Sequence, residues 1–110
     1  MIYENLSPIT PDEFTAATRL GGEQAASALL RVALYEPDQA WAEEQCLAAL
    51  SSPQPQLRLA AVTSAGHLVR RFRSLRPEIA AAVSALRDDA LVRGMANDAL
   101  EDIRIFTAEN

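Results

Sequence analysis

Cysteine, histidine and lysine are almost missing from this sequence of 110 residues, which has one cysteine, one histidine and no lysine. With Cys46 alone, the chain can form neither an internal disulfide nor a cysteine-based zinc site. His67 has no accompanying nucleophile and base that would suggest catalysis. We therefore expect a protein that is not an enzyme and uses no cofactor or metal. Cys46 is assigned to the core and His67 to the polar side of a helix, where neighbouring arginines disfavour its protonation.

Long hydrophobic runs are absent as well. No apolar run approaches the ~18 residues that a membrane-spanning helix needs. The N-terminus, MIYENLSPIT, has neither the basic nor the apolar region of a signal peptide. We predict a cytoplasmic protein without a membrane partner.

Glycine occurs four times and aromatic residues make up 5% of the chain, whereas apolar residues account for 49%. Abundant alanine and scarce glycine favour helices over strands. The length suits a single domain, residues 1–110, with a core of its own.

The formal net charge of −5 is distributed unevenly. Residues 1–57 hold eight acids and two arginines, residues 58–87 hold one acid and six arginines, and residues 88–110 hold six acids and two arginines. This pattern lacks the continuous basic face of a nucleic-acid-binding protein, so we expect no direct contact with nucleic acid. An acidic protein suits a basic partner, although a solvated surface explains any single charge more simply.

Pro55–Phe72 is the most regular segment. Proline suits the first position of a helix, and apolar residues follow at helical spacing. They are Leu57, Ala61, Val62, Ala65, Leu68, Val69 and Phe72. A helix with such a wide apolar face needs neighbouring helices to cover it.

This helix recurs later in the chain at a constant offset of 35 residues. The matching pairs are Leu57 and Val92, Arg58 and Arg93, Ala61 and Ala96, Ser64 and Ala99, Ala65 and Leu100, and Leu68 and Ile103. The preceding helix matches at an offset of 36, through Leu47 and Val83 and through Leu50 and Leu86. A two-helix unit of this length is typical of a helical solenoid.

Capping and breaking residues divide the chain into six helices after an extended segment, residues 1–9. Thr10 and Glu13 form a capping box around Pro11, and Gly21 ends the first helix. The other helices are expected at about 23–35, from Pro37-Asp38 to Ser51, at 55–72, from Pro77 to Leu86, and at about 90–106, the last with Asp88 and Asp89 before its N-terminus. Short connections predict three antiparallel hairpins.

Residues 51–68, SSPQPQLRLAAVTSAGHL, resemble the second helix of a HEAT repeat and the turn before it, through Pro55, Arg58 and Ala61. The later copy, residues 86–103, keeps the arginine and the alanine but lacks the proline. HEAT-like stacks often pair this arginine with an acid of a neighbouring helix, so the resemblance implies a structural role for it.

A closer resemblance covers nearly the whole chain. It rests on YENLSPIT at Tyr3–Thr10, ALLRVAL at Ala28–Leu34, PDQAW at Pro37–Trp41 and ANDALEDI at Ala96–Ile103. Small bacterial HEAT-like proteins with these segments resemble immunity proteins of contact-dependent and polymorphic toxin systems. The resemblance implies an all-α, short HEAT-like α-solenoid that binds the C-terminal domain of a cognate toxin.

Asp98, Glu101 and Asp102 are spaced so that they share one helix face. Like charges at these spacings cost a few tenths of a kcal/mol per pair unless they are offset, and Arg104 can reach Glu101. A solvated face is one explanation, and a carboxylate patch for a basic partner is the other. The second is favoured by the position of the three acids inside the resembling ANDALEDI segment.

Glu43 and Glu44 would extend the acidic surface. Other features have two explanations each. Trp41 either covers the join between two hairpins or presents an aromatic anchor to a partner, and the same two explanations apply to Tyr3. The basic cluster within Arg70–Arg76 suits a helix C-terminus or an acidic partner.

We therefore predict an immunity protein that neutralises a toxin, expected to be a basic nuclease-type domain, by protein–protein contact. The predicted partner-binding residues are Asp98, Glu101, Asp102, Glu44, Trp41 and Tyr3. The alternative is a non-catalytic HEAT-like scaffold or adaptor for another protein. No segment signals self-association, so we expect a monomer.

Overall fold

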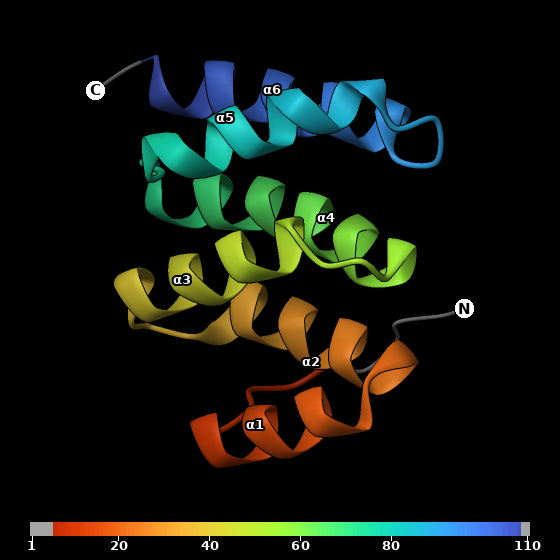
Figure 1. Ribbon diagram of the computed structural model, residues 1–110. Coiled ribbons are helices and arrows are strands. Elements are labelled where there is room, and N and C mark those ends of the chain that lie inside the picture. Colours follow the sequence, from red (N-terminus) through yellow and green to blue (C-terminus); the bar gives the residue numbers. More distant parts are fainter. Residues whose placement is uncertain (1–5, 109–110) are drawn as a thin grey trace.

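The computed structural model describes residues 6–108, which form six α-helices, one short 3₁₀ helix and no strand (Figure 1). The elements are α1 (Pro11–Leu20), α2 (Gly22–Tyr35), α3 (Gln39–Leu50), α4 (Pro55–Phe72), α5 (Pro77–Ala85), the 3₁₀ helix η1 (Leu86–Asp88) and α6 (Arg93–Thr107). The prediction of an all-α fold with about six helices is confirmed.

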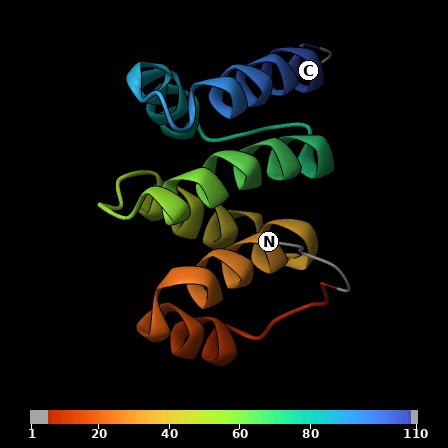
Figure 2. The ribbon, with the colours of Figure 1, turned by 90° about the vertical axis from the view of Figure 1, so that its right-hand side faces the viewer.

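The helices form three antiparallel hairpins, α1–α2, α3–α4 and α5–α6, stacked on one another (Figures 1 and 2). Helix α4 contacts both α2 and α6, and these three helices form what we call the even layer. Helix α3 contacts α5, and its Trp41 contacts Phe14 of α1; these three helices form the odd layer. The core lies between the two layers.

The helix ends follow the predicted capping chemistry. Thr10 Oγ1 accepts a hydrogen bond from Glu13 N at 3.1 Å, and the Glu13 carboxylate accepts one from Thr10 N at 2.9 Å. Gly21, at φ 69°, ends α1 in a conformation that favours glycine. The Asp38 carboxylate caps α3 by accepting a hydrogen bond from Trp41 N at 3.1 Å.

Helix α6 begins at Arg93, three residues after the predicted start at Ala90. Asp89 explains the difference, because its carboxylate accepts hydrogen bonds from Leu91 N at 2.9 Å and from Arg58 Nη2 at 3.0 Å. These bonds hold the chain in a turn through Val92. Asp89 therefore organises the loop and does not cap α6, whose N-cap has no side-chain hydrogen bond.

Arg58 and Arg93 repeat the same contact. Arg58 Nη1 donates to Ser52 O at 2.9 Å, and Arg93 Nε donates to Arg87 O at 2.8 Å, so each reaches the carbonyl six residues before it. Arg58 also pairs with an acid of the next hairpin, although Asp89 lies in a turn and not in a helix. Arg93 has no acidic partner within residues 6–108. The predicted structural role is confirmed for Arg58.

The core is built mostly from aliphatic side chains and alanine. The largest fully buried apolar side chains are Leu29, Val32, Val62, Leu68, Val69, Ile79, Val83 and Val92. Cys46 belongs to this core, as predicted, and its Sγ donates to Ala61 O at 3.3 Å. Burial and the nearby Glu43 raise the pKa of the Cys46 thiol to about 12, so the thiol stays protonated and unreactive at neutral pH.

Ser64 on α4 is fully buried, and its hydroxyl has no hydrogen-bond partner among the described residues. The equivalent residue of α6 is the buried Ala99. We expect Ser64→Ala to raise the free energy of unfolding by about 1 kcal/mol, because it removes an unpaired buried polar group and improves helix propensity. Urea unfolding followed by circular dichroism measures the change.

Ala99→Ser is the matched control, since it places the same hydroxyl at the equivalent buried position. We expect it to lower the free energy of unfolding by about 1 kcal/mol. Loss of stability in Ser64→Ala would show that the Ser64 hydroxyl is satisfied in solution.

Candidate functional site

The three acids of α6 differ in what they contact. Asp102 is half-buried, and its Oδ2 accepts hydrogen bonds from Arg70 Nη2 at 2.9 Å and Arg70 Nε at 3.2 Å. Glu101 pairs with Arg104 at 2.5 Å, as predicted, and this contact lowers the pKa of the Glu101 carboxyl. Asp98 is exposed, and no described residue pairs with it. Asp98 is therefore the carboxylate of the three that is free to bind a cation from a partner.

Gly66 lies beneath the Arg70–Asp102 ion pair. A Cβ atom at Gly66 would lie 3.2 Å from Arg70 Nη2 and 3.3 Å from Asp102 Oδ2. A glycine at this point of α4 thus lets the ion pair lie close against the helix and join α4 to α6. The ion pair was not among the predictions from the sequence.

The ion pair makes the outer sides of α4 and α6 one continuous surface, which we call the α4–α6 face. It follows the spacings of three and four that place residues on one side of a helix. Its residues are Leu59, Thr63, His67 and Arg70 on α4, and Met95, Asp98, Asp102 and Ile105 on α6. Leu59, Met95 and Ile105 are each at least 36% exposed, so this face offers apolar as well as charged contacts.

His67 belongs to the α4–α6 face, and its Nδ1 lies 3.4 Å from Arg70 Nη1. Burial, and secondarily the charge of Arg70, lower the pKa of His67, whereas Asp102 raises it. The predicted direction is confirmed, although burial and not the arginines is the larger cause. The imidazole is therefore neutral at pH 7.

An N-terminal segment packs against α2, the other outer helix of the even layer. Arg31 donates to Ser7 O and Pro8 O at 2.8 Å each, and the Tyr35 hydroxyl donates to Leu6 O at 2.9 Å. The predicted binding residue Tyr3 lies outside the described residues.

Trp41 and Glu44 lie on α3, in the odd layer, apart from the α6 carboxylates in the even layer. The ring of Trp41 is half-buried and meets Phe14 edge to face, with 5.4 Å between ring centroids and 75° between planes. Trp41 thus covers the join between the first two hairpins, as the structural alternative predicted. Glu44 is exposed. The predicted binding residues therefore form two separate groups.

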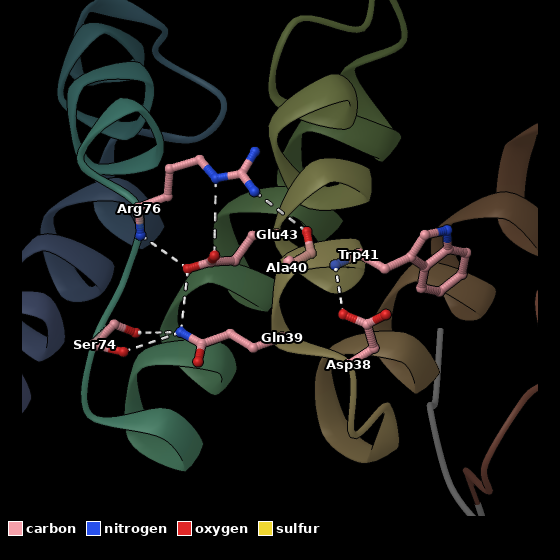
Figure 3. A network of polar contacts seen from close by, with 7 residues as sticks. All are labelled: Asp38, Gln39, Ala40, Trp41, Glu43, Ser74 and Arg76. Atoms are coloured by element: carbon pink, nitrogen blue, oxygen red, sulfur yellow. Dashed lines mark hydrogen bonds and ion pairs between the residues drawn. The ribbon is translucent and has the colours of Figure 1, made fainter.

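Glu43 is not part of the acidic surface, and that prediction is wrong. It is 7% exposed, and its Oε2 accepts hydrogen bonds from Arg76 N at 2.8 Å and Gln39 Nε2 at 3.4 Å (Figure 3). Gln39 Nε2 also donates to Ser74 Oγ at 3.0 Å. Glu43 binds the N-cap residue of α5, where a negative charge is favourable, and so fixes α3 to the α4–α5 connection.

The arginines of the basic cluster each contact another element, which neither the helix C-terminus nor the acidic-partner interpretation predicted. Arg70 pairs with Asp102 of α6, Arg71 donates to the carbonyls of Ala33 and Glu36, Arg73 lies over the Phe106 ring, and Arg76 contacts Glu43 and the Ala40 carbonyl. The cluster joins the C-terminal end of α4 to the helices around it.

The described residues include no group of histidine, cysteine and acidic side chains that could hold a metal ion. Nor does any helix among them combine the length and hydropathy needed to cross a membrane. What the α4–α6 face presents is a mixed charged and apolar surface, which is suited to contact with another protein.

No protein-family model matches the sequence, and no curated protein matches it. The chain is similar to one in the crystal structure of a CDI complex from Cupriavidus taiwanensis LMG 19424, at 34% identity and a TM-score of 0.81. The match covers 96% of this chain and 97% of that chain.

The fold and surface define a small helical protein with a face suited to protein–protein contact, and the comparison is consistent with an immunity-like protein. The comparison shows that this chain belongs to the same family as the matched chain of the CDI complex, where CDI denotes contact-dependent inhibition by toxin–immunity systems. The resemblance to contact-dependent toxin systems is thus confirmed, while its HEAT-like detail stays a prediction.

Proposed function

We propose that this protein is an immunity protein that binds the C-terminal domain of a cognate toxin and neutralises it by protein–protein contact. The observation that carries the proposal is the full-length match to a chain of a CDI complex. The protein would act without turnover, as a cytoplasmic monomer, by covering the toxin's active site or its access to substrate.

Charge supports a basic toxin domain of the nuclease type. The chain has a net charge of −5, and opposite charge accelerates the encounter of two proteins. On the α4–α6 face, the unpaired Asp98 lies one turn from the exposed Met95. A basic residue of the toxin could bind the carboxylate while an adjacent apolar residue packs against the methionine.

The test is to co-express the protein with the product of the adjacent upstream gene, as the candidate toxin. We expect the two to co-purify as a 1:1 complex and the protein to restore the growth that the toxin domain alone arrests. Intact masses of both chains after incubation check that the toxin is bound and not processed. Binding without rescue would favour the adaptor alternative, and absence of both would overturn the proposal.

A further inference from the structure

An apolar pocket of about 110 Å³ opens in the odd layer, between α1 and α3. Phe14 and Trp41 close the seam between these two helices near their N-termini. One turn beyond Phe14 and two turns beyond Trp41, the exposed Thr18 and Ala48 form part of the lining, so the pocket is accessible from solvent.

The floor of the pocket is preformed. It is lined by the buried side chains of Phe14, Ala25, Leu29 and Ala49, which come from α1, α2 and α3 at the join of the first two hairpins. The edge-to-face contact with Trp41 fixes the Phe14 ring. Little conformational entropy is therefore lost when a ligand group enters, which favours binding.

The rim of the pocket has few polar groups, and one of them has no hydrogen-bond partner among the described residues. The Thr18 hydroxyl donates to Phe14 O of its own helix at 2.8 Å. The half-buried Gln45 amide makes no hydrogen bond to any described residue, so it is available to a backbone group of an incoming chain. An apolar pocket with one or two such polar groups is the usual form of a specific binding site.

Two exposed charged residues flank the pocket lining. Glu44 lies one turn before Ala48 on α3, and Arg19 follows Thr18 on α1. The α3 side of the pocket is therefore acidic. A segment that enters here is stabilised by a positive charge on the α3 side of its apolar group.

We propose that this pocket receives an aliphatic side chain of the toxin domain, in a segment where lysine or arginine flanks that side chain. The volume favours an aliphatic group over an aromatic ring, since an apolar cavity that binds benzene has a larger volume of about 150 Å³. The inference rests on the proposed immunity function. It makes Trp41 a supporting residue behind the pocket wall and Glu44 a direct contact.

Filling the pocket reversibly tests the proposal. Cys46 is buried and its thiol pKa is raised to about 12, so Ala48→Cys introduces the one reactive thiol. Propyl methanethiosulfonate then attaches a short alkyl chain that occupies the pocket, and a reductant removes it. Affinity for the toxin domain encoded upstream is measured by titration calorimetry before labelling, after labelling and after reduction. Ala81→Cys, at an exposed alanine of α5 in the same layer, carries the same label as a control.

We expect labelled Ala48→Cys to bind the toxin domain at least about tenfold more weakly, since burial of one aliphatic side chain is lost. Reduction should restore the affinity, and labelled Ala81→Cys should bind like the wild type. Undiminished binding by labelled Ala48→Cys would overturn the pocket proposal and leave the immunity function intact. Failure of the unlabelled wild-type protein to bind would instead overturn the immunity function, and the pocket proposal with it.

The lysine or arginine that we propose beside the aliphatic side chain of the toxin domain is tested separately. Glu44→Lys should weaken binding about tenfold at low salt, with a smaller effect at high salt. Glu78→Lys, at an exposed acid of α5, makes the same change in net charge away from the pocket. Equal effects of the two variants would show that overall charge, and not a basic residue beside the pocket, is what the toxin recognises.

Discussion

Replacing Glu43 by alanine is expected to lower the free energy of unfolding by about 2–3 kcal/mol and the melting temperature by roughly 10 °C. Glu43 is buried, and its carboxylate accepts hydrogen bonds from Arg76 N and Gln39 Nε2 and lies 3.8 Å from Arg76 Nε. The alanine variant would leave Arg76 N without an acceptor at the junction of α3 and α5 and would remove the negative charge beside the Arg76 guanidinium. Thermal and urea unfolding, followed by circular dichroism, measure the loss.

Glu44 supplies a matched control, because it is the same residue type at the next position of the same helix but is exposed. We expect Glu44→Ala to change the free energy of unfolding by less than about 0.5 kcal/mol. Glu43→Gln keeps one oxygen as an acceptor and should fall between the two. Equal stability of the Glu43 and Glu44 alanine variants would contradict the structural role that we assign to Glu43.

Reversing two charges on α6, with Asp98→Lys and Glu101→Lys, is expected to slow association with the toxin domain by about 100-fold at low ionic strength. Asp98 has no partner among the described residues, and Glu101 has only an exposed one, so the fold should tolerate both changes. Asp102 is left unchanged because it holds Arg70. Stopped-flow or surface-based kinetics over a series of salt concentrations measure the effect, which should shrink as salt rises.

The control for this prediction separates local charge from total charge. Glu78→Lys with Asp88→Lys changes the net charge by the same amount at exposed acids of α5 and η1. We expect this pair to slow association much less. If both double variants slow association equally, the α6 carboxylates have no special part in binding, and the α4–α6 face is not the interface.

The bounds of a helix were predictable where its capping residues and its apolar spacing indicate the same segment. Pro55 fixes the start of α4, the apolar spacing continues without interruption, and the predicted bounds coincide with the observed Pro55–Phe72. The capping box at Thr10 and Glu13 likewise placed the start of α1. In both cases, the determining interactions lie within one or two turns of sequence, and so a single sequence contains them.

The wrong predictions concern places where a residue far away in the sequence determines the local structure. Glu43 looks like a surface acid, because nothing near it in the sequence shows that the backbone N–H of Arg76 will face it. The late start of α6 depends on Arg58, which binds Asp89 from 31 residues away. Such interactions follow from the way the hairpins stack, and helical periodicity does not encode them.

The candidate site was predictable only in part. Spacing placed Asp98, Glu101 and Asp102 on α6 correctly, but the Arg70–Asp102 pair, which leaves Asp98 as the free acid, required the α4–α6 contact. The pocket near Trp41 depends on four helices at once. Its one sequence signal was a tryptophan followed by Gln45 and Ala48 at helical spacing.

The stacking of consecutive hairpins also bears on how quickly the chain reaches its native state. The contacts between helices join hairpins that follow one another in the sequence. Helical proteins with such short-range contacts fold within microseconds to milliseconds. A newly translated copy would therefore fold almost as soon as it leaves the ribosome. Under the proposed immunity function, the rate of synthesis, and not of folding, would then limit how fast a cell renews its supply of the protein.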